Sequence, residues 1–188
     1  MKKILNCFLL LITATLLFSC KNDKLKTITI ENRYSFSVPA LSIPYQQANA
    51  EASAVYADIL KNLFVMVIEE TKDEINAVFS DNGEVYVATL DDYTELLASV
   101  YDVQESSGFL LSSDFEFLVD TAINSLPAYY LQNTRPIDGY EMFYNMAVIE
   151  GNDRFYQFIV WTLGENKAEN ENLIKNIIYS FSEKKTFK

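Results

Sequence analysis

The chain of 188 residues contains no histidine, and its only cysteines are Cys7 and Cys20. The absence of histidine excludes Ser-His-Asp and Cys-His nucleophile arrangements, because these use an imidazole as the general base. It also excludes the usual zinc sites, which are built from histidine and free cysteine side chains. Catalysis by this chain would have to depend on carboxylates, lysine, tyrosine or serine alone.

Glycine and basic residues are scarce as well. The five glycines are isolated from one another, so no glycine-rich loop is available to bind a phosphate or a dinucleotide. We therefore expect no cofactor and no metal site. The 15 basic residues are outnumbered by 26 acidic ones, and an acidic protein is repelled by phosphate backbones. This composition excludes nucleic acid as a partner.

The first 19 residues have the layout of a secretory signal peptide. Lys2 and Lys3 are followed by an apolar stretch, Ile4–Phe18, and then by the polar segment 21–24. A transmembrane helix needs roughly 20 apolar residues, and this stretch is shorter. Removal of residues 1–19 leaves 13 basic and 26 acidic residues, so the net charge of the mature chain is near −13.

The segment Leu17-Phe18-Ser19-Cys20 resembles the lipobox of bacterial lipoproteins, with a leucine three residues before the cleavage point and a small residue directly before the cysteine. The resemblance implies cleavage before Cys20, a diacylglycerol on its sulfur and acylation of the new amino terminus. Stable anchoring needs more than one acyl chain, and a lipoprotein carries several on this cysteine. The alternative is an ordinary signal peptide followed by a chance cysteine.

The predicted anchor places the protein in the bacterial cell envelope, attached to a membrane through Cys20 and facing the periplasm or the cell surface. Residues 20–26 would be the lipidated cysteine and a polar tether. Cys7 is lost with the signal peptide and Cys20 carries the lipid, so the mature domain is predicted to have no disulfide.

Residues 27–182 are predicted to form a single α+β domain, followed by a polar tail at 183–188. The run Leu63–Ile68 is apolar at every position, which is typical of a strand covered on both faces. Segregated strands, hairpins and helices favour a mainly antiparallel sheet. Strands are predicted at Thr27–Ile30, Tyr34–Val38, Ala54–Leu60, Leu63–Glu69, Ala128–Asn133, Glu141–Glu150 and Arg154–Leu163. Helices are predicted at Lys72–Phe79, Leu90–Tyr101 and Lys167–Phe181, and Phe115–Val119 fits either a strand or a helix.

This order of strands and helices, with three short sequence segments in it, resembles the PsbP-like fold, which includes periplasmic lipoproteins of the DcrB type. The segments are Tyr34-Ser-Phe-Ser-Val-Pro39, the hairpin Tyr140–Leu163 and the closing Ile177-Ile-Tyr-Ser-Phe181. The chain also looks like small lipoproteins of the Bacteroidetes. The resemblance implies an αβα sandwich around a central, mainly antiparallel sheet. It implies no single activity, because members of such a fold serve as accessory subunits, assembly factors or binding modules.

Twelve tyrosines are many for a chain of this length and could form a binding surface. Five of them crowd the part of the chain predicted to form antiparallel strands, and aromatic rings with a polar tip can bind sugars or a protein partner. The same rings could equally be core or sheet cover. The predicted binding face consists of Tyr129, Tyr130, Tyr140, Tyr144 and Tyr156.

Clustered carboxylates are the other candidate site. Glu69, Glu70, Asp73 and Glu74 could supply oxygen ligands to calcium, but their spacing matches no calcium loop. Acids at the first turn of a helix, stabilised by its dipole, are the favoured interpretation, and Asp91 with Asp92 receives the same one.

Three functions remain open. The favoured hypothesis is a non-enzymatic accessory module that binds an envelope protein. The second is a small-ligand or carbohydrate binder that uses tyrosine faces. The third is a hydrolase with two carboxylates held roughly 5 to 9 Å apart.

Replacement of Cys20 by Ala is expected to move the protein from the membrane fraction to the soluble fraction, because the acylated sulfur is lost. Fractionation of cells followed by immunoblotting measures the distribution. Cys7→Ala is the matched control and should leave the protein in the membrane fraction. Retention of the Cys20→Ala protein in membranes would contradict the predicted anchor.

Overall fold

The computed structural model describes residues 24–45, 50–80, 85–103 and 112–184. The predicted signal peptide and Cys20 lie outside the described residues. So do Asn82 and Gly83, where the sequence predicts a turn, and residues 104–111, which are most of the loop that the sequence predicts at Gln104–Ser113. None of the helices in these ranges has the length and apolar character needed to cross a membrane.

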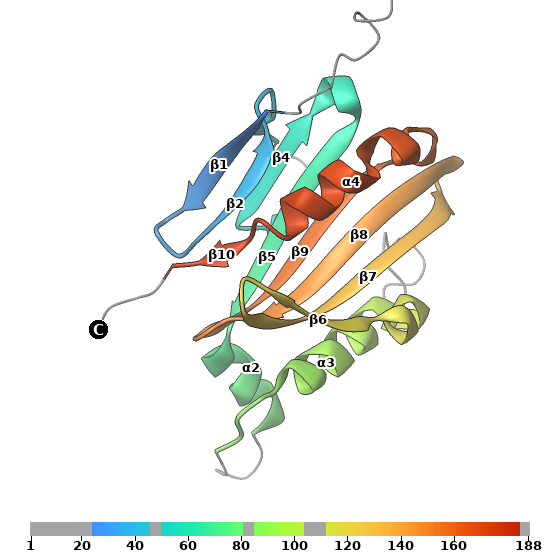
Figure 1. Ribbon diagram of the computed structural model, residues 1–188. Coiled ribbons are helices and arrows are strands. Elements are labelled where there is room, and N and C mark those ends of the chain that lie inside the picture. The colour runs from blue at the N-terminus through green and yellow to red at the C-terminus, as the bar shows by residue number, and fades with distance from the viewer. Residues whose placement is uncertain (1–23, 46–49, 81–84, 104–111, 185–188) are drawn as a thin grey trace, which may run out of the picture.

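A seven-stranded antiparallel sheet forms the centre of the domain, in the order β3-β4-β5-β9-β8-β7-β6 (Figure 1). The hairpin of β8 (Tyr140–Glu150) and β9 (Arg154–Leu163) lies in its middle and is buried on both faces along most of its length. The remaining strands are β3 (Ile43–Pro44), β4 (Ala54–Asp58), β5 (Leu63–Thr71), β6 (Val119–Ile123) and β7 (Leu126–Ile137).

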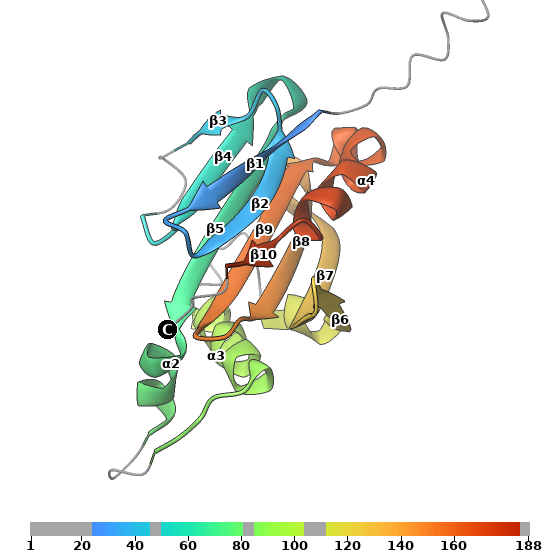
Figure 2. The same ribbon diagram turned by 60° about the vertical axis from the view of Figure 1, so that its left-hand side comes forward.

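A second, three-stranded sheet lies against one face of the first (Figure 2). Its central strand β2 (Tyr34–Pro39) pairs antiparallel with β1 (Leu25–Ile30) and with the short β10 (Ser182–Glu183). Regular structure therefore extends slightly beyond the predicted domain bounds of 27 and 182.

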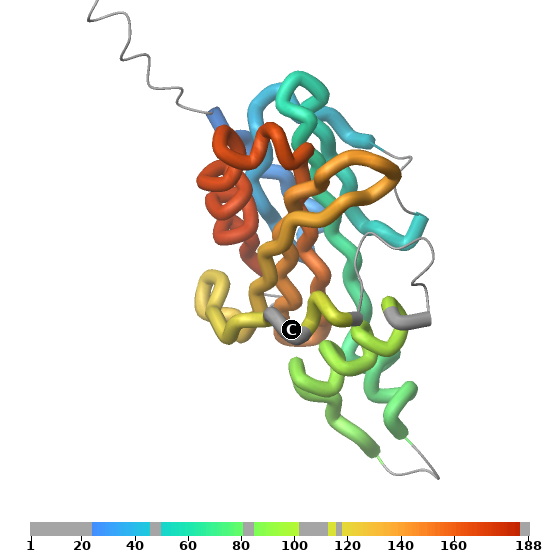
Figure 3. Tube along the Cα trace, turned by 90° about the vertical axis from the view of Figure 1, so that its right-hand side faces the viewer, coloured from blue at the N-terminus to red at the C-terminus, as the bar shows by residue number. Residues whose placement is uncertain are grey.

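Helices cover both faces of the large sheet, which confirms the predicted α+β class and its layers. Helix α4 (Lys167–Ile178) and strand β2 pack on one face, and α2 (Lys72–Phe79) and α3 (Leu90–Val103) pack on the other (Figure 3). The structure adds to the predicted sandwich that one outer layer is shared between a helix and the small sheet. Each face has its own hydrophobic core.

Local sequence explains where the helices begin. Thr71 caps α2 by accepting a hydrogen bond from the Glu74 amide at 3.1 Å, while the Glu74 carboxylate accepts one from the Thr71 amide at 2.9 Å. Thr89 and Asp92 make the same reciprocal pair at α3. Such capping boxes satisfy backbone donors that the first helical turn leaves unpaired. The predicted helix-start role is therefore confirmed for Asp73, Glu74, Asp91 and Asp92, but it was wrong for Glu69 and Glu70, which lie in strand β5.

Several predicted boundaries were wrong. The strand Ala54–Leu60 ends at Asp58, because the Asp58 side chain caps a 3-10 turn, η1 (Ile59–Lys61). The closing helix ends at Ile178 rather than Phe181, and the chain then extends into β10.

The ambiguous segment Phe115–Val119 proved to be the end of a 3-10 turn, η2 (Ser112–Phe117), and the start of β6. The sequence did not predict strand β6 as such, because its hairpin turn lacks glycine. The turn residues Asn124 and Ser125 instead adopt left-handed backbone angles.

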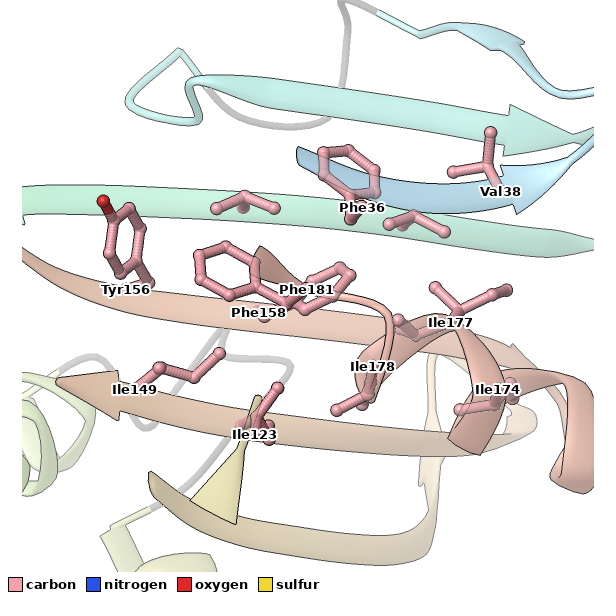
Figure 4. Packing of buried hydrophobic residues seen from close by; sticks show 14 of the residues in the cluster. Phe36, Val38, Ile123, Ile149, Tyr156, Phe158, Ile174, Ile177, Ile178 and Phe181 are labelled. Carbon is pink, nitrogen blue, oxygen red and sulfur yellow. The ribbon is translucent and has the colours of Figure 1, made fainter. Parts of the chain in front are cut away.

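Aromatic rings dominate the core between β2, β9 and the end of α4. Phe181 lies 5.5 Å from the ring of Tyr34, 4.9 Å from Tyr156 and 5.8 Å from Phe158, measured between ring centroids (Figure 4). Phe158 in turn contacts Phe36 edge-on at 5.3 Å. These rings join the C-terminal segment to both sheets.

Phe181→Ala should lower the free energy of unfolding by about 3 to 5 kcal/mol, because it leaves a cavity among closely packed rings. Urea denaturation followed by circular dichroism measures the change. Tyr140→Ala, at an exposed aromatic position, is the control and should cost less than about 1 kcal/mol. Equal losses in the two variants would contradict the proposed importance of the Phe181 contacts.

Candidate functional site: an acidic cleft beside helix α3

The five tyrosines of the predicted binding face do not form one surface. Tyr130 and Tyr156 pack on the face covered by α4, whereas Tyr129 and Tyr144 pack on the face covered by α3. Neighbouring residues of a strand point to opposite faces, which separates Tyr129 from Tyr130. Tyr140 is exposed at the start of β8.

The hydroxyls of four of these tyrosines bond within the protein. Tyr144 and Tyr156 are buried, and they donate hydrogen bonds to Asp114 at 2.7 Å and to Glu183 at 3.1 Å. Tyr129 donates to Asp91 and Tyr130 to Asn145. These contacts assign most of the cluster to structural roles and leave no continuous aromatic platform.

A cavity of about 460 Å³ lies between helix α3 and the C-terminal half of β5, and none of the five predicted tyrosines is among its described lining residues. Of the residues that the structure describes, four glutamates and no basic residue contribute to the lining, together with an apolar wall from α3. We call it the α3 cleft. Its lining residues are Glu51, Ile68, Glu69, Glu70, Glu74, Leu96, Leu97, Val100, Tyr101 and Gln157.

The position of the cleft follows from the unequal lengths of two strands. Strand β4 pairs with β5 only from Leu63 to Val67, whereas β9 pairs with β5 through to Thr71. Beyond Val67, strand β5 therefore pairs with β9 along one edge, while its pairing with β4 along the other edge has ended. Helix α3 crosses near this end of the sheet (Figure 1), and the space beside it is the cleft.

A hydrogen-bonded network of buried polar side chains forms the inner end of the cleft. Tyr93 donates to the Glu70 carboxylate, and the Gln157 amide donates to the Tyr93 hydroxyl at 3.1 Å. Tyr101 donates to the Gln157 carbonyl oxygen at 3.0 Å. Buried polar groups of this kind are stable only when they are paired, so the network holds Glu70 in a defined position.

Burial controls the protonation of both tyrosines in this network. It raises the pKa of Tyr101 to about 12, and it raises the pKa of Tyr93 further, with help from the nearby Glu70 carboxylate. Both hydroxyls therefore remain protonated donors at neutral pH. Within the part of the chain that the structure describes, the lining contains no Ser, Cys or Lys side chain that could act as a nucleophile.

The other carboxylates of the lining are also engaged. Glu69 faces away from Glu70 and accepts hydrogen bonds from Arg33, whose Nε lies 3.1 Å from both carboxylate oxygens. Arg154 Nε is 3.7 Å from Glu69. Hydrogen bonds from the Thr71 hydroxyl and amide lower the pKa of Glu74.

No group of three or more metal-ligating side chains gathers among the residues that the structure describes. The cleft is therefore a surface of fixed hydrogen-bond acceptors beside an apolar wall. Such a surface suits a ligand group that carries positive charge on an apolar stem, as Lys and Arg side chains do.

Comparison with solved structures finds the same fold in proteins of very different sequence. Cyanobacterial PsbP (CyanoP) from Synechocystis sp. PCC 6803 matches with a TM-score of 0.57 and 11% identity over 88% of this chain and 95% of its own. LpqN of Mycobacterium tuberculosis, described as involved in cell envelope biogenesis, matches with a TM-score of 0.53 and 11% identity over 88% of each chain.

A protein from Bacteroides thetaiotaomicron matches with a TM-score of 0.52 and 6% identity over 85% of this chain. This chain spans about half of that protein, 48% of its length. No family model and no curated protein matches the sequence. At these identities the likeness concerns the fold alone, and it confirms the predicted PsbP-like fold.

Sequence reasoning found part of the α3 cleft and missed the rest. Glu69, Glu70 and Glu74 belong to the predicted acidic cluster, whereas Asp73 is not in the lining. Gln157 could have been predicted as a site residue from the sequence, because it is a polar residue within the largely apolar strand β9. Tyr101 gave no such signal, since its helical spacing marks a core residue equally well.

The stability of the fold should decrease at alkaline pH, because the tyrosines of the cleft are buried in their protonated form. A tyrosine ionises near pH 10 in the unfolded chain, so the raised pKa of Tyr101 stabilises the fold below pH 10, and this contribution is lost as pH rises toward 12. The melting temperature of Tyr101→Phe should therefore fall less between pH 8 and pH 11 than that of the parent chain. Differential scanning calorimetry measures both profiles, and parallel profiles would contradict the assignment.

Proposed function

We propose that this protein is a lipid-anchored module of the bacterial cell envelope that binds a partner protein through the α3 cleft. The partner places a Lys or Arg side chain against Glu51, Glu70 and Glu74 and packs its apolar stem on Leu96 and Val100. The observation that carries this proposal is the composition of the cleft, whose described lining combines glutamates and an apolar wall without a basic residue.

The engagement of the carboxylates supports binding over hydrolysis. A glycosidase needs one carboxyl group to donate a proton and a second to act as base or nucleophile. Here Glu70 accepts a hydrogen bond from Tyr93, Glu69 is paired with Arg33, and Glu74 caps a helix. Glu69 and Glu70 are held within the protein by these contacts, and hydrogen bonds from Thr71 lower the pKa of Glu74, which does not suit a general acid.

A small cationic ligand is the second candidate. The cleft volume of about 460 Å³ lies within the roughly 300 to 1,000 Å³ range of small-molecule sites. The tyrosine-based carbohydrate site has less support, because the predicted tyrosines are divided between two faces of the sheet. The envelope role described for LpqN, which shares the fold, agrees with the proposed location.

The absence of free thiols from the proposed mature chain allows a sharp test. Val100→Cys places a single reactive thiol on the exposed wall of the cleft, where a thiol-linked photo-crosslinker can capture the partner in intact cells. Val119→Cys, at an exposed valine of β6 outside the cleft, is the matched control. We expect one protein to be crosslinked from position 100 at a yield at least fivefold above that from position 119.

Charge reversal tests the chemistry of the contact. Glu51→Lys in the Val100→Cys background should reduce the crosslinked product at least threefold, because it places a cation in the binding surface. Glu95→Lys, on the same helix as Val100 but outside the lining, should leave the yield unchanged.

Equal crosslinking from positions 100 and 119 would contradict the proposal. So would a lack of product under conditions that capture a known envelope complex. Binding of a small polyamine that Glu51→Lys abolishes, in the absence of any protein product, would support the second candidate instead.

A further inference from the structure

Large apolar side chains are exposed together at the end of the domain opposite α2. Leu60 is 83% exposed, Leu41 68%, Ile59 55% and Ile43 54%. Burial of such side chains stabilises a protein, so their joint exposure on a free surface is unfavourable. A cluster of this kind marks a contact with lipid or with another molecule.

Backbone pairing places these residues at one edge. Ile43 of β3 pairs with Ala57 of β4, two residues before Ile59. Leu41 lies in the turn that follows β2, where the Ala40 amide donates to the Lys24 carbonyl at 2.8 Å. In Figure 2 the start of β1, strand β3 and the turn between β4 and β5 lie at the upper end of the molecule, and α2 lies at the lower end.

Three lysines accompany the apolar residues. Lys24 and Lys26 stand at the start of β1, and the Lys26 ammonium donates to the Ser42 carbonyl at 2.5 Å, beside Leu41. Lys61 follows Leu60 directly. Basic residues are a minority in this acidic chain, so their presence beside exposed apolar side chains is a distinct local charge pattern.

The described carboxylates around this end lie in three places. Asp58 is buried and accepts a hydrogen bond from the Lys61 amide at 3.3 Å. Glu141 and Glu165 lie around the start of β8 and the turn after β9, with β5 and β9 between them and the β4 edge. Glu169 is exposed one residue before Asn170, whose side-chain amide donates to the Lys61 carbonyl oxygen at 3.2 Å, so the charge of Lys61 has a carboxylate in its neighbourhood. Among the described residues, the part of this end that carries Lys24 and Lys26 is therefore the part suited to an anionic surface.

The predicted lipid site is close to the same end. Cys20 precedes Leu25, the first residue of β1, by five positions. An extended chain spans at most about 3.5 Å per residue, so the anchor lies within about 18 Å of the start of β1. A membrane is consequently the surface that the patch would meet first.

We propose that Leu41, Ile43, Ile59 and Leu60 insert into the interfacial region of the anchoring bilayer, while Lys24 and Lys26 contact anionic lipid head groups. This inference rests on the proposed lipid anchor at Cys20. Apolar side chains and lysines are the combination by which proteins bind such interfaces. The domain is thereby held in one orientation on the membrane.

This orientation directs the α3 cleft away from the lipid. Strand β5 begins at Leu63, next to the patch, and reaches Glu70 in the cleft after seven residues, which is about 23 Å at the strand rise. The patch and the cleft therefore lie at opposite ends of the same strand. A bound partner would approach from the aqueous side.

Depth-dependent quenching tests the proposal on the lipidated protein. Leu60→Cys and Val85→Cys are labelled separately with nitrobenzoxadiazole, because Val85 is also exposed but lies before α3 at the other end. Each is reconstituted into vesicles of phosphatidylglycerol and phosphatidylethanolamine, with or without brominated acyl chains. We expect bromination to reduce the emission from position 60 at least twofold and that from position 85 by less than a tenth.

A second variant tests the contribution of charge. Replacement of Lys24 and Lys26 by Gln should at least halve the quenching at position 60 in these vesicles. It should have a smaller effect in vesicles of phosphatidylcholine. Failure of the protein to float with vesicles overturns the anchor and this inference together. Flotation with equal or absent quenching at positions 60 and 85 overturns the docking surface alone, and the crosslinking from Val100 tests the cleft independently.

Discussion

The fold depends on the need to bury both faces of the β8–β9 hairpin. Nearly every side chain from Phe143 to Ile149 and from Phe155 to Val160 is apolar or fully enclosed, so neither face of these strands can meet water. One face is covered by α4 and β2, and the other by α2 and α3. The layers of the domain follow from this single requirement, because a strand apolar on both sides is stable only between two layers.

The α3 cleft arises where this burial is incomplete. Strand β5 continues beyond its pairing with β4, and at that point its side chains change from valine and isoleucine to Glu69 and Glu70. Gln157 on β9, which pairs with Ile68, and Tyr93 on α3 complete a paired polar network with Glu70. Satisfied polar groups at the end of an apolar layer preserve an open, acidic space without destabilising the core beneath it.

Two ends of one strand thereby acquire different properties. Near Leu63 the surface is apolar and basic and lies close to the predicted lipid attachment, and near Glu70 it is acidic and concave. The sheet between them would separate the proposed membrane contact from the proposed partner contact. Such a separation would suit an accessory protein that presents a binding site at a set height above a membrane.

The amino-acid sequence by itself determined the α+β class, the β8–β9 hairpin, the capped starts of α2 and α3 and the acidic character of the segment from Glu69 to Glu74. These depend on local periodicity, turn residues and side chains a few positions apart. The tertiary structure decided what depends on distant pairing. It separated Tyr129 from Tyr130, buried Tyr144 and Tyr156, and ended the pairing of β4 with β5 at Val67, which opened the cleft. Alternation along a strand can be recognised in a sequence, but which face meets a helix and where a neighbouring strand ends are set by packing between segments far apart in the chain.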